Sequence, residues 1–111
     1  MESQNGLGMP MTAVNVDKEI IDFETFPLSQ LQTAEIVLLN LGDNPLIVPN
    51  IISSCNCVKV EYDKQPVEPG EKLSLKVSYH SDRKGSFRKI LNIYCNVKRS
   101  PLQVKIYGRA E

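Results

Sequence analysis

Apolar and polar residues alternate along much of the chain, in short segments separated by polar turns. The clearest case is the segment 73–79, in which every second residue is Leu, Val or Tyr and the residues between them are Ser or Lys. Such alternation is typical of a β-strand with one buried face. Strand character recurs in the segments 20–26, 31–41, 46–53, 57–62, 87–97 and 101–107. About seven antiparallel strands with frequent turns and no amphipathic helix predict an all-β, immunoglobulin-like β-sandwich.

The stretch 39–48 joins two of these segments through a short polar turn. We expect Gly42 to supply a positive φ and residues 43–45 to cap the turn and start the next strand. The pattern predicts a β-hairpin at the centre of the domain. Pro49 cannot donate a ladder hydrogen bond, which predicts a bulge or an edge strand after it. Further along, the pair Pro69 and Gly70 predicts a type II turn.

The segment 31–41 is apolar on both of its faces, which is unusual for a strand with one wet face. Either another part of the chain covers the outer face, or that face is a contact patch. We take Val37, Leu39 and Leu41, joined by Ile90, as the candidate contact surface. A protein partner or a second copy of the chain could bind there, and an exposed strand edge is the alternative binding surface.

Composition narrows the class of protein. The chain has 111 residues, suited to one domain, and we expect a flexible lead-in over residues 1–18 and the sandwich over residues 19–111. The formal net charge is zero, which argues against a nucleic-acid groove or an anionic membrane surface as partner.

The chain as written has no secretory signal and no apolar run near the roughly 20 residues that span a bilayer. Membrane attachment would therefore need a lipid anchor outside this chain.

Three cysteines are present, and Cys55 and Cys57 are separated by one residue. They could form a redox-active thiol pair, but an extended strand separates such Cα atoms by roughly 6.6 Å, so a bridge needs a turn at Asn56. Together with Cys95 and His80 they could hold a metal, although zinc sites usually have two to four residues between paired cysteines. The interpretation we favour is that all three cysteines are small buried apolar residues.

Other candidate chemistry is sparse. His80 is the only histidine and lies in a polar turn, with Asp82 two residues on and serines at positions 78, 81 and 86. Nothing in the sequence identifies a cleft that would bring a nucleophile, a base and an orienting carboxylate together. No phosphate-binding loop is present, and we expect neither a cofactor nor a metal. The basic residues 83–84 and 88–89 are read as a solvated hairpin tip, with contact to an anionic partner as the alternative. Carbohydrate binding is disfavoured because the chain lacks Trp.

Several short motifs occur in an order that resembles a bacterial family of domains of unknown function, related to Hydin-like and major-sperm-protein-like immunoglobulin folds. The motifs lie at residues 22–23, 39–46, 54–57, 67–71, 85–87 and 94–96. The chain departs from the family pattern at four positions. Glu24 and Asn56 replace glycines, Leu41 replaces a threonine, and Cys95 replaces a serine. Asn56 remains compatible because Asn enters the left-handed region more easily than other residues.

The resemblance implies an envelope or periplasmic protein of Bacteroidetes-type bacteria, often a lipoprotein, with no established enzymatic activity. Relatives of the fold act as binding and scaffolding modules. We therefore expect a non-catalytic interaction or structural module. The alternatives are a thiol-disulfide or metal-handling protein that uses Cys55 and Cys57, and a carbohydrate-binding sandwich.

Overall fold

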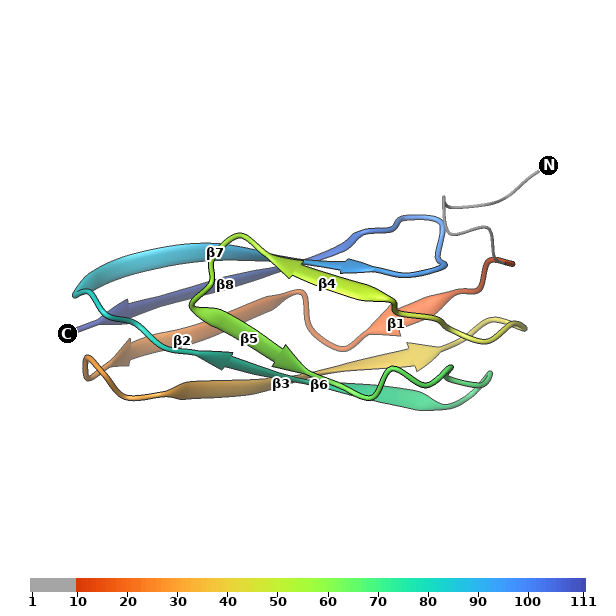
Figure 1. Cartoon of the computed structure of the whole chain (residues 1–111), viewed down its shortest axis with the longest axis horizontal. Helices are drawn as coiled ribbons and strands as arrows, with labels where there is room; N and C mark the ends of the chain where they lie inside the picture. Colours follow the sequence, from red (N-terminus) through yellow and green to blue (C-terminus); the bar gives the residue numbers. More distant parts are fainter. Residues whose placement is uncertain (1–9) are drawn as a thin grey trace.

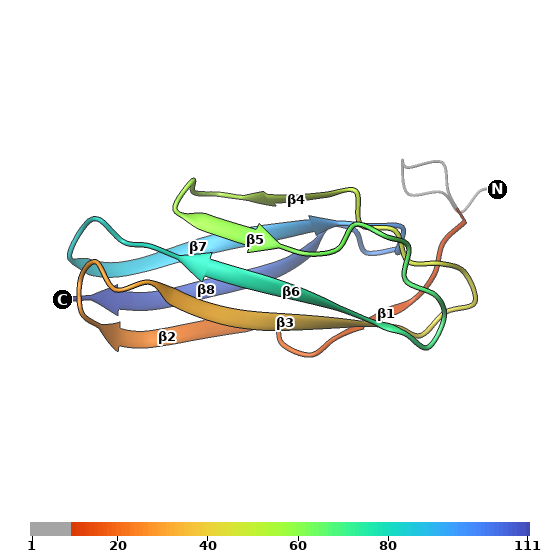
Figure 2. The ribbon, with the colours of Figure 1, turned by 60° about the horizontal axis from the view of Figure 1, so that its bottom comes forward.

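The computed structural model describes residues 10–111, which form two four-stranded sheets packed face to face (Figures 1 and 2). Among the described residues, every regular element is a β-strand. The strands are β1 (Val14–Val16), β2 (Ile20–Phe26), β3 (Gln32–Asn40), β4 (Asn50–Ser53), β5 (Val58–Glu61), β6 (Lys72–Tyr79), β7 (Gly85–Tyr94) and β8 (Leu102–Ala110). The predicted immunoglobulin-like sandwich is confirmed.

The first sheet has the strand order β1-β3-β6-β5, and the second has the order β2-β8-β7-β4. All pairs are antiparallel except β2 and β8, which run parallel, so the expectation of purely antiparallel strands is wrong for this pair. The first part of the chain changes sheets, because β1 pairs with β3 and β2 pairs with β8. The predicted lead-in, residues 1–18, thus includes one strand of the sandwich, and residues 1–9 of it lie outside the described residues.

The core is made by the inward faces of the two sheets, as strand alternation predicts. Leu75 and Val77 of β6 are fully buried, and the exposed residues of that strand alternate with its buried residues. On β7 the inward residues Leu91 and Ile93 are likewise fully buried. Each truncation of such a side chain to Ala removes about 2–5 kcal/mol of stability. Burial of the apolar strand faces is therefore what holds the two sheets together.

The predicted hairpin at residues 39–48 is wrong. β3 belongs to the first sheet and β4 to the second, so the segment between them is a connection from one sheet to the other. Leu46 and Val48 are buried in the core, and Leu46 forms only an isolated bridge with Val67. β4 begins directly after Pro49 and lies at the edge of the second sheet, so the predicted edge strand after Pro49 is confirmed.

Gly42 is needed for a different reason from the one we expected. It is not among the residues with positive φ, whereas Gly70 has φ of 85° and sits in a turn closed by Glu71 N–H donating to Glu68 O. This geometry confirms the predicted type II turn. A Cβ atom on Gly42 would lie 2.1 Å from Thr12 Oγ1 and 2.6 Å from Ala13 N. Gly42 therefore permits the close approach of the segment leading into β1.

Two buried asparagines tie the connections together at the same end of the sandwich. Asn40 Oδ1 accepts hydrogen bonds from Thr12 Oγ1 and Gly42 N, and its Nδ2 donates to the carbonyls of Asn44 and Val67. In the same way, the Asn96 side chain accepts from Ile47 N and donates to the carbonyls of Pro10 and Pro45. The polar atoms of both buried side chains already have hydrogen-bond partners within the protein. They therefore stabilise this end of the fold and do not form a ligand-binding site.

Candidate functional site

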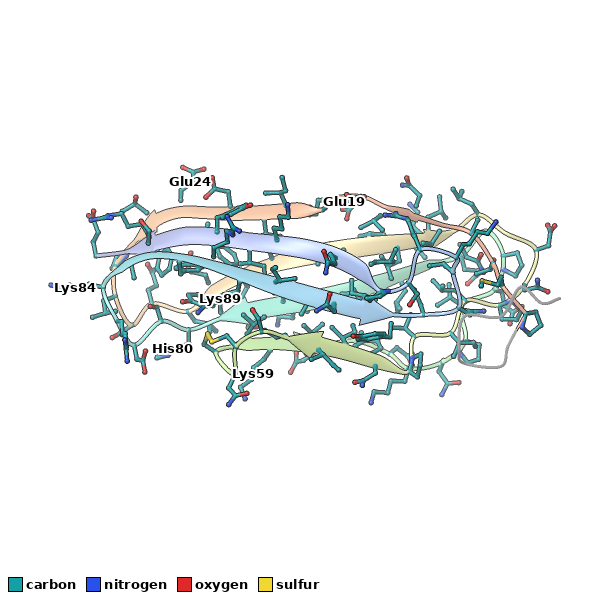
Figure 3. The ribbon with its side chains drawn as sticks, turned by 90° about the horizontal axis from the view of Figure 1, so that it is seen from above. Glu19, Glu24, Lys59, His80, Lys84 and Lys89 are labelled. Atoms are coloured by element: carbon teal, nitrogen blue, oxygen red, sulfur yellow. A yellow bond between two sulfur atoms is a disulfide. The ribbon has the colours of Figure 1, made fainter. Side chains whose placement is uncertain are left out.

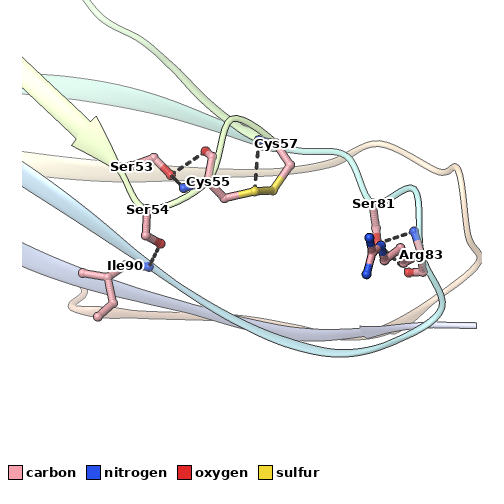
Figure 4. Close-up of a disulfide and its surroundings, with 7 residues drawn as sticks. All are labelled: Ser53, Ser54, Cys55, Cys57, Ser81, Arg83 and Ile90. Carbon is pink, nitrogen blue, oxygen red and sulfur yellow. Dashed lines mark hydrogen bonds between the residues drawn. A yellow bond between two sulfur atoms is a disulfide. The ribbon is translucent and has the colours of Figure 1, made fainter.

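The chain passes from the second sheet to the first near the end of the sandwich that lies opposite Asn40 and Asn96. β4 ends at Ser53 and β5 begins at Val58, and we call residues 54–57 the crossing loop. Ser54 makes the last contact with β7, since its N–H donates to Ile90 O at 2.9 Å and its Oγ accepts from Ile90 N at 3.0 Å (Figure 4). Beyond Ser54 the chain turns away from β7.

A disulfide bond joins Cys55 to Cys57 immediately after this point (Figure 4). A turn at Asn56 brings the two Cα atoms to 5.2 Å, shorter than an extended strand allows. Ser53 Oγ donates to Cys55 O at 2.8 Å and accepts from Cys55 N at 3.0 Å. The crossing loop is thus held by a covalent bond and by hydrogen bonds. Asn56 does not have a positive φ, so asparagine in place of the glycine of the family pattern requires no left-handed conformation there.

The disulfide changes the interpretation of the cysteines. Cys55 and Cys57 are half-buried and bonded to each other, so treating them as buried thiols is wrong, whereas Cys95 is fully buried as expected. Burial raises the pKa of the Cys95 thiol to about 11, against smaller lowering effects from a main-chain hydrogen bond at Val97 and the charge of Arg99. Within residues 10–111 no cluster of three or more His, Cys, Asp or Glu side chains could hold a metal ion.

An open cleft of about 970 Å³ lies between the crossing loop, the turn from β6 to β7 and the start of β7. We call it the disulfide cleft, because both bonded cysteines line it. Two aromatic rings also line the cleft: Tyr79 from the first sheet stacks on Phe87 from the second, with centroids 4.1 Å apart and an angle of 20° between the rings. Phe26 packs edge-on against both rings. This cluster joins the two sheets and gives the cleft an apolar wall.

The charged residues that line the disulfide cleft are mainly basic: Lys59, Arg83, Lys84 and Lys89, against the single carboxylate of Asp82. In Figure 3, Lys59, Lys84 and Lys89 lie in the left half of the view, and Glu19 and Glu24 lie along its upper edge, with Glu24 toward the same end as the lysines. The ion pairs within the described residues involve other side chains. The four cations are thus available to an anionic group even though the whole chain has a formal net charge of zero.

One edge of β7 is uncovered along this cleft. β4 pairs with residues 91–94 of β7, and Ser54 reaches Ile90, but none of the described strands covers residues 85–89 on that side. On its other side β7 pairs with β8 without a register shift. The disulfide cleft therefore combines an apolar wall, basic side chains and a short open strand edge.

The predicted contact surface is divided between the two sheets. Val37 and Leu39 are half-buried on β3 of the first sheet, and Leu41, 60% exposed, lies just beyond that strand. Ile90 is half-buried on β7 of the second sheet, so it lies on a different outer face. The four residues do not form one continuous surface.

The polar turn that contains His80 does not assemble a catalytic group. Ser81 Oγ donates to Arg83 O at 2.7 Å, so this hydroxyl stabilises the turn from β6 to β7 (Figure 4). His80 is exposed, and its side chain forms no hydrogen bond with another described residue. Sequence reasoning found the basic residues 83–84 and 88–89 but not the cleft. The only signal for the cleft was the cysteine pair together with that basic cluster.

Comparison with known proteins places the chain in a family. A model described as protein of unknown function (DUF1573) matches residues 14–110. The chain belongs to the DUF1573 family. The matched region spans all eight strands, including β1, and covers the disulfide cleft. No functionally curated protein matches the sequence.

Solved structures share the fold of this DUF1573 domain. A protein of unknown function from Porphyromonas gingivalis W83 matches with a TM-score of 0.78 and 17% identity, covering 89% of this chain and 47% of that chain. A PapD-like domain of human CEP192 matches with a TM-score of 0.76 and 12% identity, covering 96% and 92%. A major-sperm-protein family member from C. elegans matches with a TM-score of 0.57 and 12% identity, covering 90% and 99%.

At these identities the similarity concerns the fold alone, an immunoglobulin-like sandwich of the PapD and major-sperm-protein type. The chain spans about half the length of the Porphyromonas protein, since it covers 47% of it. Among residues 10–111, no helical segment has the length and apolarity required to cross a bilayer. The fold and the family are compatible with a non-catalytic interaction module.

Proposed function

We propose that this DUF1573 domain is a non-catalytic protein-binding module of the bacterial cell envelope, and that it binds its partner in the disulfide cleft. The observation that carries the proposal is the open edge of β7 beside the disulfide cleft. One wall of this cleft is the crossing loop, which the Cys55–Cys57 disulfide holds in place. A preformed cleft loses little conformational entropy on binding, and an open strand edge offers main-chain hydrogen bonds to a partner.

The envelope location is supported by two arguments. Disulfides persist in oxidising compartments such as the periplasm and are rare in the reducing cytosol, and this domain carries one. The family resemblance implies an envelope or periplasmic protein as well. A quantitative thiol assay on protein isolated from its native compartment tests this. We expect Cys55 and Cys57 to be oxidised, whereas a fully reduced pair would contradict the assignment.

Binding in the cleft is tested by panning a phage-displayed library of random peptides against the folded domain. Enriched peptides are then mapped by changes in the amide signals of isotopically labelled protein. We expect the largest changes at cleft residues such as Ser86, Phe87 and Asn56. Changes centred on Val37 and Leu39 of β3 would instead place binding on the outer face of the first sheet. Failure to enrich any peptide above a plain β-sandwich control would contradict the proposed function.

A second candidate function is thiol-disulfide exchange, because the disulfide-bonded residues Cys55 and Cys57 line an open cleft. A partner thiolate would attack one sulfur, forming a mixed disulfide and releasing the other cysteine as a thiolate. A second partner thiol would then resolve the mixed disulfide, leaving both cysteines reduced and the partner oxidised. Incubation with glutathione followed by mass spectrometry checks this function. We expect no mixed disulfide on the folded domain within minutes, and its rapid formation would favour exchange over simple binding.

A further inference from the structure

We propose that the ligand of the disulfide cleft is an extended peptide segment rich in Asp or Glu, which adds as a strand to the open edge of β7 at Ser86 and Arg88. This inference rests on the proposed function and deepens it, since it names the chemistry and the binding mode of the partner segment. The segment would continue the line of β4 past the point where the chain leaves the second sheet.

The open edge is identified from hydrogen-bond directions. Both main-chain polar groups of Ile90 point toward β4, because its carbonyl accepts from Ser54 N and its N–H donates to Ser54 Oγ. In a regular strand these directions alternate, so the next residues pointing the same way are Arg88 and Ser86. The unbroken register of β7 with β8 keeps the alternation regular. Among residues 10–111, no strand pairs with β7 at these two positions.

The disulfide explains why this edge stays open. A strand paired with β7 would have to continue straight on from Ser54, but Cys55 is bonded to Cys57, which directs the chain across to β5. His80 N donates to Cys57 O at 3.2 Å, so the crossing loop is also fastened to the first sheet. The space beside residues 85–89 is the disulfide cleft, which is lined by Ser86, Phe87 and Lys89. A partner segment of about five residues, roughly 17 Å long, would match this edge.

Side chains in the cleft define what the segment should carry. Strand alternation turns Phe87 and Lys89 of β7 toward the space between the sheets, on the side of the buried Leu91. Every second residue of an added strand would face the same space. Carboxylates at those positions would meet the ammonium group of Lys89, and Lys59, Arg83 and Lys84 surround the cleft. Charge complementarity therefore favours an acidic segment over a neutral or basic one.

The test uses an eight-residue fluorescent peptide in which Glu alternates with Thr, with a Lys-Thr peptide as its control. Binding to the intact oxidised domain is measured by fluorescence anisotropy at low salt. We expect saturable binding of the Glu peptide and none of the Lys peptide. Two further Glu peptides carry N-methyl groups on alternate residues, one set on even and one on odd positions. Strand addition requires one set to weaken binding at least roughly tenfold and the other to have little effect.

Variants of the domain test the charge argument. Lys89→Glu should weaken binding of the Glu peptide roughly tenfold or more, since it replaces an attraction by a repulsion. Lys105→Glu is the matched control, because Lys105 is exposed on β8 outside the cleft, and it should leave affinity unchanged. Lys84→Glu, in the exposed turn, provides a second cleft variant if Lys89→Glu does not fold.

The outcomes separate this inference from the proposed function. If both N-methylated sets bind equally well, or if Lys89→Glu and Lys105→Glu behave alike, strand addition of an acidic segment is wrong. If the Glu peptide does not bind but library peptides still map to the cleft, the inference fails and the proposed function stands. If neither the Glu peptide nor any library peptide binds, both fail.

Discussion

Cys57 N–H lies 3.2 Å from Cys55 Sγ, and the same two cysteines form the disulfide at the point where the chain passes from the second sheet to the first. Ser54 immediately precedes this bridge and bonds to Ile90 of β7 through its main-chain N–H and its side-chain Oγ. The disulfide therefore closes a local turn rather than joining distant strands. Its structural consequence is to end the pairing along β7 and leave residues 85–89 of that strand beside an open cleft.

Replacing both bonded cysteines by Ala should have a local effect. A disulfide that closes so short a loop contributes only roughly 1–2 kcal/mol to the free energy of unfolding. We expect a loss of about that size in urea denaturation. Amide exchange should become faster at residues 54–58, while core amides such as that of Leu75 keep most of their protection. Complete unfolding of the variant would contradict this description and make the bridge essential to the whole fold.

Glu24→Gly should stabilise the domain. Glu24 has φ of 59°, a left-handed conformation that a residue with a Cβ adopts at a cost of roughly 1–2 kcal/mol. Its N–H donates to Asp22 Oδ1 at 2.8 Å, and the pairing with β8 shifts register between Asp22 and Thr25. After subtracting the greater flexibility of glycine in the unfolded chain, we expect a gain of about 0.5–1 kcal/mol. The measurement is the midpoint of urea denaturation.

Glu35→Gly is the matched control for this stabilisation. Glu35 is an exposed residue of β3 whose φ is not positive, so glycine there should lower stability by roughly 0.5–1 kcal/mol. If Glu24→Gly is as destabilising as Glu35→Gly, the left-handed conformation at residue 24 carries no cost.

Asn40→Ala should be strongly destabilising. Its fully buried side chain makes four hydrogen bonds, and truncation would leave their partners without an acceptor or a donor. We expect a loss of roughly 2–4 kcal/mol in the free energy of unfolding. Asn92→Ala, which removes one exposed hydrogen bond from Gln103, should change it by less than about 0.5 kcal/mol. Equal effects of the two variants would show that the buried network does not hold this end together.

The stability of the domain should fall between about pH 9 and pH 11 because of Cys95. Burial raises the pKa of its thiol from the ordinary 9.0 to about 11, so the unfolded chain loses this proton at lower pH than the folded protein. The contribution is complete below pH 9 and is lost as the pH rises through 11, on the order of 2–3 kcal/mol. Cys95→Ala should flatten this part of the profile, measured by urea denaturation at each pH. An unchanged slope would assign the loss to other groups.

The fold was predictable because strand alternation is a local signal. The inward residues of β6 and β7 follow directly from alternating apolar positions, and they make up much of the core. β1 was missed because three residues are too few for a pattern. The sequence predicts a hairpin after β3 because Gly42 and Pro45 are turn residues in a hairpin and in a connection between sheets alike. The structure differs from a hairpin because β3 and β4 join different sheets and Leu46 is buried in the core, and both features depend on distant residues.

The candidate site was predictable only in part. The pair Cys55 and Cys57 stood out in the sequence, and residues 83–84 and 88–89 stood out as a basic cluster. The cleft itself depends on how far β4 extends along β7, and that is set by a turn at Asn56 that no local pattern reveals. Likewise, the aromatic wall forms only when β6 and β7, which belong to different sheets, are brought together.

The most direct test of the central claim is residue-resolved hydrogen exchange on the oxidised domain, with and without a saturating concentration of the Glu-Thr peptide. We expect the amides of Ser86 and Arg88 to exchange rapidly in the free domain and to become protected on binding. The amide of Phe87, in the ladder with β8, should be protected in both states. Amides of Ser86 and Arg88 that are already protected in the free domain, or that remain fast when the peptide is bound, would contradict strand addition at β7.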